Sequence, residues 1–206
     1  MGGQLRVGVL ASGGGTNLQA LLDGVHGFEA KIVAVASDKV DAVALERARG
    51  AGVPTSVFPR DAFPDRLARD AAIGDWLEAQ GVELVVLAGY MAILDASFIS
   101  RFRDRIINVH PSLLPAFAGI GSVQQALDYG VKVFGVTVHF VDEGVDTGAI
   151  ILQRAIELPD ATDASSVLDA LRPLEHALLP DAVRLIAVGA VHRDPAHPRR
   201  VVIDKR

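Results

Sequence analysis

Two polar side chains that could stabilise a developing negative charge, Asn108 and His110, lie at the end of an apolar segment that begins at Ile106. If this segment is a strand, residues two positions apart point to the same side, so the amide and the imidazole project together. The carboxyl end of a strand is where open α/β sheets bind ligands. The pattern therefore predicts hydrogen-bond donors to an oxyanion, although such a pair is also common at ordinary strand ends.

A carboxylate that could serve the same site is Asp146, which lies in a glycine-punctuated turn over residues 142–148. A carboxylate beside His110 would raise the pKa of the imidazole and could relay a proton through water. An aspartate in a turn also often caps backbone amides. Proton transfer by Asp146 is therefore a hypothesis that depends on the fold.

Other catalytic chemistries find less support in the sequence. Ser112 together with His110 and Asp146 suggests a serine hydrolase, but no serine occupies a G-x-S-x-G nucleophile elbow. No metal site is predicted, because the histidines form no H-x-x-x-H or H-E-x-x-H pair. These scattered histidines are His110, His139, His176, His192 and His197. The chain has no cysteine, which excludes disulfides, thiolate metal sites and cysteine nucleophiles.

A second region with binding chemistry is a glycine-rich turn near the N-terminus. It consists of Gly13, Gly14, Gly15, Thr16 and Asn17. Glycines let the backbone approach a ligand closely, and the N-terminus of a following helix adds unpaired N–H groups and a partial positive charge. These features predict a phosphate site, although a tight turn without any ligand explains the same residues.

The kind of phosphate ligand can be narrowed from the spacing. Leu18 occupies the third glycine position of the dinucleotide fingerprint G-x-G-x-x-G, which weakens the hypothesis of a nicotinamide dehydrogenase. Asp38 could still imitate the ribose-binding acid of such enzymes, so that hypothesis stays open. No G-K-[ST] follows, which excludes a nucleoside triphosphate P-loop. A monophosphate fits the turn better than either.

These residues must be positioned by the elements around them, and short apolar runs alternate with helix-periodic stretches, which predicts an α/β fold with a mostly parallel sheet. Strands are expected at residues 5–10, 31–36, 55–58, 84–88, 106–109, 133–140 and 149–156, and a terminal hairpin at 191–203. Helices are expected from about residue 17 and at 41–49, 63–80, 95–102 and 165–188. We expect a kink or break at Pro173. The irregular segment 110–122 is long enough to be functional or mobile.

Composition limits the partners and the location of the protein. The 206 residues are 50% hydrophobic, enough for one domain with a buried core. Twenty basic and twenty-five acidic residues give a net charge of −5, which predicts no binding to nucleic acid or to a membrane surface. The sequence contains no signal peptide and no apolar run of membrane-spanning length. We expect a cytoplasmic protein that binds small molecules, and a homodimer is left open.

Four motifs in order make the chain resemble the phosphoribosylglycinamide formyltransferase family. They are Ser-Gly-Gly-Gly-Thr-Asn-Leu-Gln-Ala at residues 12–20, Leu-Ala-Gly-Tyr-Met at 87–91, Asn-Val-His-Pro-Ser-Leu-Leu-Pro at 108–115, and His-Phe-Val-Asp at 139–142 with Asp-Thr-Gly at 146–148. The resemblance covers residues 7 to about 185. It implies a single-domain α/β three-layer sandwich with a mostly parallel central sheet, the formyltransferase fold. Its Rossmann-like half would be residues 5–105, and its catalytic and folate-binding half residues 106–206.

The resemblance also implies a reaction and a role for each matching residue. The formyl group of 10-formyltetrahydrofolate would pass to the amine of glycinamide ribonucleotide in purine biosynthesis, with no metal required. Asn108 and protonated His110 would hold the oxyanion, and Asp146 would assist proton transfer through water. Glycinamide ribonucleotide would contact Gly13, Gly14, Gly15, Thr16, Asn17, Gly89, Pro111 and Glu175. The folate would contact Arg66, Met91, Ala92, Ile93, Leu94, Asn108, Val141, Asp142, Glu143, Gly144 and Asp146.

Related enzymes share the Asn, His and Asp of this resemblance. The transfer-RNA formyltransferases carry a further nucleic-acid-binding domain, and the formyltetrahydrofolate hydrolases carry an N-terminal regulatory domain. From the length of the chain, we expect neither. The remaining alternative is a related protein that binds folate or phosphate, or that formylates another small amine.

The chain departs from the family pattern at three places. Residues 117–121, Phe-Ala-Gly-Ile-Gly, lack the usual proline and histidine of a mobile loop, and Gly121 should make that loop more flexible. Ala92 replaces a usual arginine, which bears on folate contacts. Pro173 lies in the helix that would present Glu175, so a break there would shift that carboxylate.

Overall fold

The computed structural model describes residues 3–204 and divides into two compact units, one ending at Ile107 and one beginning at Asn108. Hydrogen bonding orders the strands β3-β2-β1-β4-β5-β6-β7 in a seven-stranded sheet. Strand β5 (Ile106–His110) contains the division between the units. The α/β class with a mostly parallel sheet, expected from the alternation of apolar runs and helical stretches, is confirmed.

The first unit is built on four parallel strands. These are β1 (Leu5–Leu10), β2 (Ala30–Ser37), β3 (Thr55–Val57) and β4 (Leu84–Leu87). β1 pairs in parallel with both β2 and β4, and β2 pairs in parallel with β3. Strands covered on both faces need apolar side chains in both directions, and Val85 and Val86 of β4 are both fully buried.

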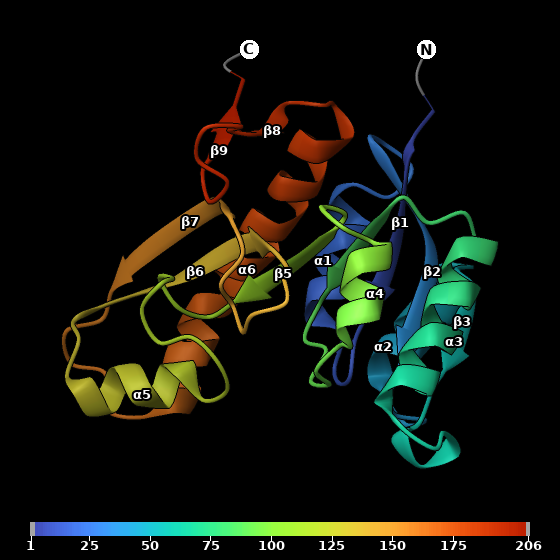
Figure 1. Cartoon of the computed structure of the whole chain (residues 1–206). Coiled ribbons are helices and arrows are strands. Elements are labelled where there is room, and N and C mark those ends of the chain that lie inside the picture. Colours follow the sequence, from blue (N-terminus) through green and yellow to red (C-terminus); the bar gives the residue numbers. More distant parts are fainter. Residues whose placement is uncertain (1–2, 205–206) are drawn as a thin grey trace. The chain divides into compact units, whose positions relative to one another are not determined.

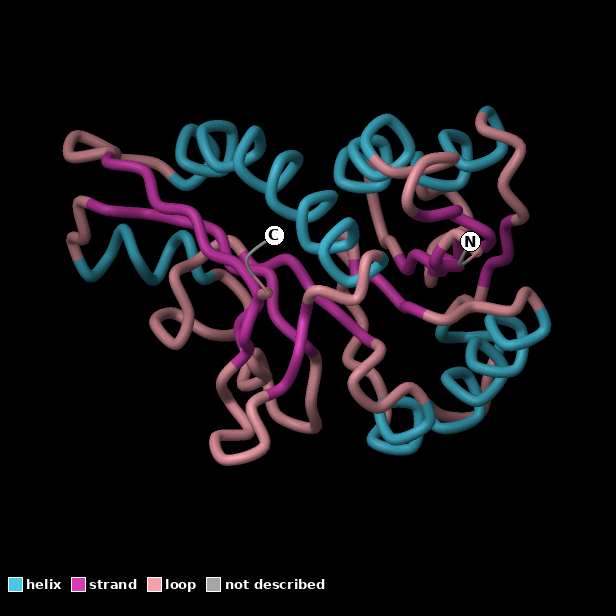
Figure 2. Tube along the Cα trace, turned by 90° about the horizontal axis from the view of Figure 1, so that it is seen from above, coloured by secondary structure: helices cyan, strands magenta, loops and turns pink. Residues whose placement is uncertain are grey.

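Helices cover both faces of these strands, as Figure 2 shows. The helices are α1 (Thr16–Gly24), α2 (Val43–Gly50), α3 (Arg66–Ala79) and α4 (Ala96–Arg101), with a 3-10 turn at Arg60–Ala62. α1 packs on α2, and α3 packs on α4. The rings of Phe98 in α4 and of Phe102 directly after it are tilted against each other, with centroids 4.9 Å apart. The carboxyl ends of β1, β2 and β4 therefore open into loops that this core holds in place.

The second unit combines an antiparallel strand pair with a long helix (Figure 1). β6 (Val133–Phe140) pairs with β7 (Ile150–Glu157), and α6 (Ala164–Ala187) packs against both strands. The register of β6 against β7 shifts between Val138 and His139. Strands β8 (Val191–Arg193) and β9 (Val201–Ile203) form the expected terminal hairpin. Among the described residues, no helix is long and apolar enough to cross a membrane.

The helices differ from the expectations at two places. Helix α5 (Ser122–Tyr129) was not predicted, although Gly130 ends it in the left-handed conformation that commonly terminates helices. A kink or break was expected at Pro173; no break occurs, because α6 is continuous through Pro173 and also through Pro180. Burial of an apolar face that includes Leu171 and Leu178 outweighs the backbone hydrogen bonds that the prolines cannot donate.

Candidate active site

Strand β5 places Asn108 and His110 on one side, as the two-residue period of a strand requires. His110 is buried and Asn108 is half-buried. The intervening Val109 is buried on the opposite side, which anchors the strand end in the core. The two hydrogen-bonding side chains therefore emerge from a rigid element.

Asp146 meets both of these side chains inside the second unit. Its Oδ2 lies 3.3 Å from Nδ1 of His110, and its Oδ1 lies 3.5 Å from Nδ2 of Asn108. Asp146 adopts a left-handed backbone conformation with φ of 52°, which is uncommon for a residue with a side chain. The structure thus brings together the three residues that the sequence singles out for chemistry.

The environment of Asp146 favours its ionised form. Burial alone would raise the pKa of this carboxyl, but the hydrogen bond from His139 and the backbone N–H of Gly119 lower it. The positive charges of His110 and His139 act in the same direction, and the pKa falls from 3.8 to about 2. Asp146 is therefore a carboxylate at every physiological pH.

His139 is a member of this cluster to which sequence reasoning assigned no role. Its Nε2 lies 3.3 Å from Nδ2 of Asn108 and 3.5 Å from Oδ1 of Asp146. Its Nδ1–H donates to the carbonyl of Phe140 over 2.7 Å. The register of β6 against β7 shifts beside His139, where Ile151 of β7 is left without a partner in β6, and this local irregularity has no signal in the sequence.

The loop after β5 covers the cluster with its own backbone. Nε2–H of His110 donates to the carbonyl of Phe117 over 3.0 Å, and N–H of Gly119 donates to Oδ2 of Asp146 over 2.8 Å. Phe117 has a left-handed φ of 53° and its ring contacts Tyr129 of α5. The loop therefore occupies hydrogen-bonding positions that a substrate would need.

The glycine-rich turn belongs to the first unit and leads directly into α1. Gly15 has a φ of 69°, and a Cβ there would come 2.6 Å from Cα of Ala44, so only glycine fits. Gly13 and Gly14 are exposed. The guanidinium of Arg47, which sequence reasoning missed, donates to the carbonyl of Gly14 over 2.8 Å. A cation thus lies beside the exposed part of the turn.

Asp38 does not have the exposed position that a ribose-binding acid needs. It is buried, and its Oδ1 accepts a hydrogen bond of 2.5 Å from the hydroxyl of Ser12. The same hydroxyl accepts a hydrogen bond of 2.9 Å from N–H of Met91. Asp38 therefore ties the glycine-rich turn to the loop after β4, and the case for a nicotinamide dehydrogenase weakens further.

The remaining candidate residues divide between the two units. In the first, Gly89 and residues 91–94 form the loop after β4, and Arg66 begins α3 with its Nε 3.8 Å from Oδ2 of Asp95. In the second, Pro111 follows β5, and Glu175 lies half-buried in α6. Residues 141–144 begin the loop between β6 and β7.

That loop between β6 and β7 is held by one aspartate. Oδ1 of Asp142 accepts hydrogen bonds from N–H of Gly144 over 3.1 Å and from the hydroxyl of Thr147 over 2.6 Å. Both bonds lie within the loop, so they shape the backbone that leads to Asp146.

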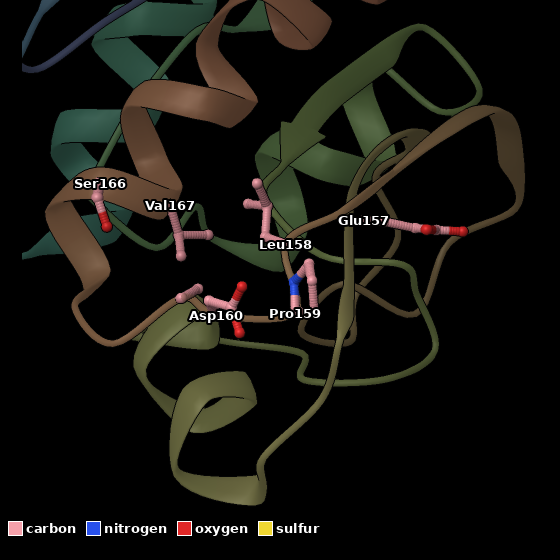
Figure 3. Close-up of a pocket in the computed structure, with 7 residues that line it drawn as sticks. Glu157, Leu158, Pro159, Asp160, Ser166 and Val167 are labelled. Atoms are coloured by element: carbon pink, nitrogen blue, oxygen red, sulfur yellow. The ribbon is translucent and has the colours of Figure 1, made fainter.

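A pocket of about 290 Å³ lies elsewhere in the second unit. Figure 3 shows it where β7 turns into α6, with Ser166 and Val167 on the helix. The Asp146 loop precedes β7 and the pocket follows it, so the two lie at opposite ends of an eight-residue strand about 26 Å long at 3.3 Å per residue. Among residues 3–204, no group of three or more His, Cys, Asp or Glu side chains is placed to hold a metal ion.

Comparison with known proteins agrees with these motifs. The formyl transferase family matches residues 5–183. Phosphoribosylglycinamide formyltransferase of Haemophilus influenzae is 43% identical over 186 residues, which cover 89% of this chain and 88% of that protein. The crystal structure of glycinamide ribonucleotide transformylase 1 from Symbiobacterium toebii matches with a TM-score of 0.95 and 45% identity, covering 100% of this chain and 96% of that one.

Some relatives are much longer than this chain. The trifunctional purine biosynthetic protein adenosine-3 of Drosophila pseudoobscura pseudoobscura is 44% identical over 192 residues, but the match spans only 14% of its length. On the extent of the family match and the identity to a relative of similar length, the chain belongs to the formyl transferase family.

Proposed function

We propose that this protein transfers the formyl group of 10-formyltetrahydrofolate to the amine of glycinamide ribonucleotide, a step of purine biosynthesis. The observation that carries the proposal is the cluster of Asn108, His110 and Asp146, in which the carboxylate of Asp146 lies within 3.5 Å of polar atoms of both other side chains. The names of the Haemophilus influenzae and Symbiobacterium toebii relatives support the same reaction.

The chemistry is a direct attack of the amine nitrogen on the formyl carbon. A new C–N bond forms, and the carbonyl electron pair moves to oxygen, giving a tetrahedral oxyanion. Nδ2–H of Asn108 and Nε2–H of His110 would donate to this oxygen. Both ring nitrogens of His110 face acceptors, Asp146 and the carbonyl of Phe117, an arrangement that suits an imidazolium with two N–H donors.

Proton transfer completes the reaction. The attacking amine must lose a proton, and the folate nitrogen must gain one before its bond to the formyl carbon breaks. Asp146 would orient a bound water that relays this proton, because its low pKa keeps the carboxylate ionised and able to accept hydrogen bonds from the water. Before substrate binds, the carbonyl of Phe117 must leave His110, so opening of the 117–119 loop is part of the proposed cycle.

The binding residues are assigned from the family motifs. The ribonucleotide phosphate would lie on residues 13–17 with Arg47 nearby, and Glu175 would hold the glycinamide amine. The folate would lie against residues 91–94 and 141–146, with Arg66 near its glutamate. Asn108 and Asp146 would contact both reactants, and Gly89 and Pro111 would line the nucleotide site. The reaction needs no metal, and we place the enzyme in the cytoplasm, with a homodimer left open.

The test is the absorbance change on mixing the protein with both substrates. His110→Ala should lower kcat by about 10²–10³, the usual effect of losing one oxyanion donor. His197→Ala is the matched control, because that imidazole is exposed in the terminal hairpin. Unchanged turnover in His110→Ala would contradict the assigned role of His110.

The phosphate site can be tested separately with two variants, each of which replaces one glycine by alanine. A Cβ added at Gly14 meets no atom within 4 Å, so Gly14→Ala should fold normally and yet crowd a bound phosphate. We expect weaker binding of glycinamide ribonucleotide by about tenfold or more. Gly50→Ala, where a Cβ also meets nothing, is the control. Equal affinity in the two variants would exclude the turn as the phosphate site.

A second candidate is hydrolysis of the formyl donor. A formyltetrahydrofolate deformylase from Pseudomonas syringae matches the fold with a TM-score of 0.89 and 26% identity. Consumption of 10-formyltetrahydrofolate in the absence of glycinamide ribonucleotide would favour this activity. Binding of both ligands without any product would instead favour a binding protein, or transfer to another small amine.

A further inference from the structure

A buried ion pair on α3 has no part in the proposed reaction. Nη2 of Arg69 lies 2.7 Å from Oδ1 of Asp70, and the two side chains are 4% and 0% exposed. Nε of Arg69 donates to the same oxygen over 2.8 Å. Removing two charges from water is costly, so a buried pair requires further hydrogen bonds to be tolerated.

Those further hydrogen bonds end on one short stretch of backbone. Oδ2 of Asp70 accepts a bond of 2.6 Å from N–H of Asp95, and Nη2 of Arg69 donates over 3.3 Å to the carbonyl of Ile93. Residues 91–95, here called the 91–95 segment, contain no helix or strand. The ion pair therefore connects α3 to the 91–95 segment, which has no helical or strand hydrogen bonding of its own.

The other end of the 91–95 segment is held by a separate group. N–H of Met91 donates to the hydroxyl of Ser12 over 2.9 Å, and that hydroxyl donates to buried Asp38. Arg60 reaches the carbonyl of Met91 over 3.5 Å. The segment is thus fixed at both ends by side chains from different elements.

The side chains of the fixed segment alternate between exposure and burial. Met91 and Ile93 are 58% and 62% exposed, whereas Ala92 and Leu94 are each 7% exposed. Two large apolar side chains thus face outward from a backbone that is held rigidly beneath them. Such a surface can pack against the face of a ring system, and a fixed surface costs a ligand less ordering on binding.

We infer that Arg69 and Asp70 are positioning residues, which hold the 91–95 segment in the conformation that binds the ring system of the formyl donor. This inference rests on the proposed function, because it concerns the donor site of that reaction. Neither side chain touches the donor or the reacting atoms. Their loss leaves the chemistry intact and weakens donor binding, because the segment must then be ordered by the ligand itself.

The experiment removes the pair without leaving a lone buried charge. In the double variant Arg69→Met/Asp70→Leu, apolar side chains of similar size fill the same space, a replacement that buried ion pairs often tolerate. Arg69→Lys keeps the charge but not the fork of donors that reaches both Asp70 and Ile93. Arg101→Met is the matched control, because Arg101 pairs with Asp75 and Glu78 across α3 and α4 without contacting the segment.

Three readouts separate positioning from general loss of stability. Calorimetric titration with 10-formyltetrahydrofolate should show a dissociation constant raised about tenfold or more in the double variant and by an intermediate factor in Arg69→Lys. The KM for the donor should rise in parallel, while kcat at saturating donor and the KM for glycinamide ribonucleotide stay within about twofold. Hydrogen exchange at the amide of Asp95 should accelerate only in the double variant.

The outcomes distinguish this inference from the proposed function. Absence of donor binding by the unmodified protein would overturn the proposed function and this inference with it. Donor binding by the unmodified protein that persists equally in a folded double variant would overturn the inference alone. A rise in the donor dissociation constant that Arg101→Met reproduces would also overturn it, since loss of α3 stability would then be sufficient.

Discussion

Asp146 is the residue on which the candidate active site converges. One carboxylate contacts His110, His139 and Asn108, and it also accepts the N–H of Gly119. Its left-handed backbone turns the side chain back toward β5 and β6. Since hydrogen bonds to the charged form outweigh burial, the carboxylate remains ionised while it lies among potential cations.

The ionisation of Asp146 leads to a prediction about pH. The pKa is lowered from 3.8 to about 2, so protonation occurs only in strong acid. Asp146→Asn should therefore lower kcat by about 10²–10⁴, and by the same factor throughout the range from about pH 5 to about pH 8. Steady-state rates of both proteins across that range provide the measurement. A ratio that changes with pH would show that Asp146 titrates there.

At the scale of elements, α6 has a capped N-terminus but contains two internal prolines. Oδ1 of Asp163 accepts the N–H of Ser166 over 2.8 Å and caps the helix N-terminus. Pro173 is exposed, whereas Pro180 is buried. Neither proline can donate to the carbonyl four residues earlier, so the helix depends on its packing against β6 and β7.

The two prolines should respond differently to replacement by alanine. At Pro173 alanine restores a helical N–H and removes little packing, so Pro173→Ala should raise the free energy of unfolding by about 2 kcal/mol. Pro180→Ala restores the same bond but removes buried ring contacts, so its gain should be smaller. Urea denaturation of the two variants and the unmodified chain gives the comparison. Destabilisation by Pro173→Ala would mean that the helix is built around the proline.

At the scale of the whole molecule, four carboxyl groups have pKa values that are shifted toward the charged state. Hydrogen bonds from Arg101 lower the pKa of Glu78, and those from Ser97 lower the pKa of Asp95. The pKa of Asp163, like that of Asp146, is lowered to about 2, in this case chiefly by the N–H of Ser166. All four carboxyls bind protons less readily in the folded chain than in the unfolded one.

The lowered pKa values of these four carboxyl groups predict that acid lowers the free energy of unfolding. As pH falls, the unfolded chain binds these protons before the folded chain does. The stabilising contribution of the four carboxylates is therefore complete above about pH 5.5 and is lost as pH falls toward about 2. The free energy of unfolding, measured with urea, should therefore decline over that interval. Asp163→Asn keeps the helix cap without a titrating group, so its decline should be shallower. An unfolding free energy that stays constant from about pH 4 to about pH 2 would contradict the lowered pKa values of these carboxyl groups.

The local features of this protein were determined by the sequence alone. The apolar runs predicted the strands, the two-residue period predicted that Asn108 and His110 share a side, and four motifs in order identified the family. Each of these depends on backbone geometry over a few residues, which side-chain type and spacing control directly.

Contacts between residues that are far apart in the sequence follow from the tertiary structure and could not be predicted from local patterns. Asn108 and Asp146 lie 38 positions apart, and their contact depends on how β6 and β7 pair and on the backbone of the loop between them. The contact of His139 with Asp146 and the hold of Arg69 and Asp70 on the 91–95 segment arise in the same way. Such contacts form because burial of many side chains fixes the register of whole elements, a cooperative effect that no local pattern encodes.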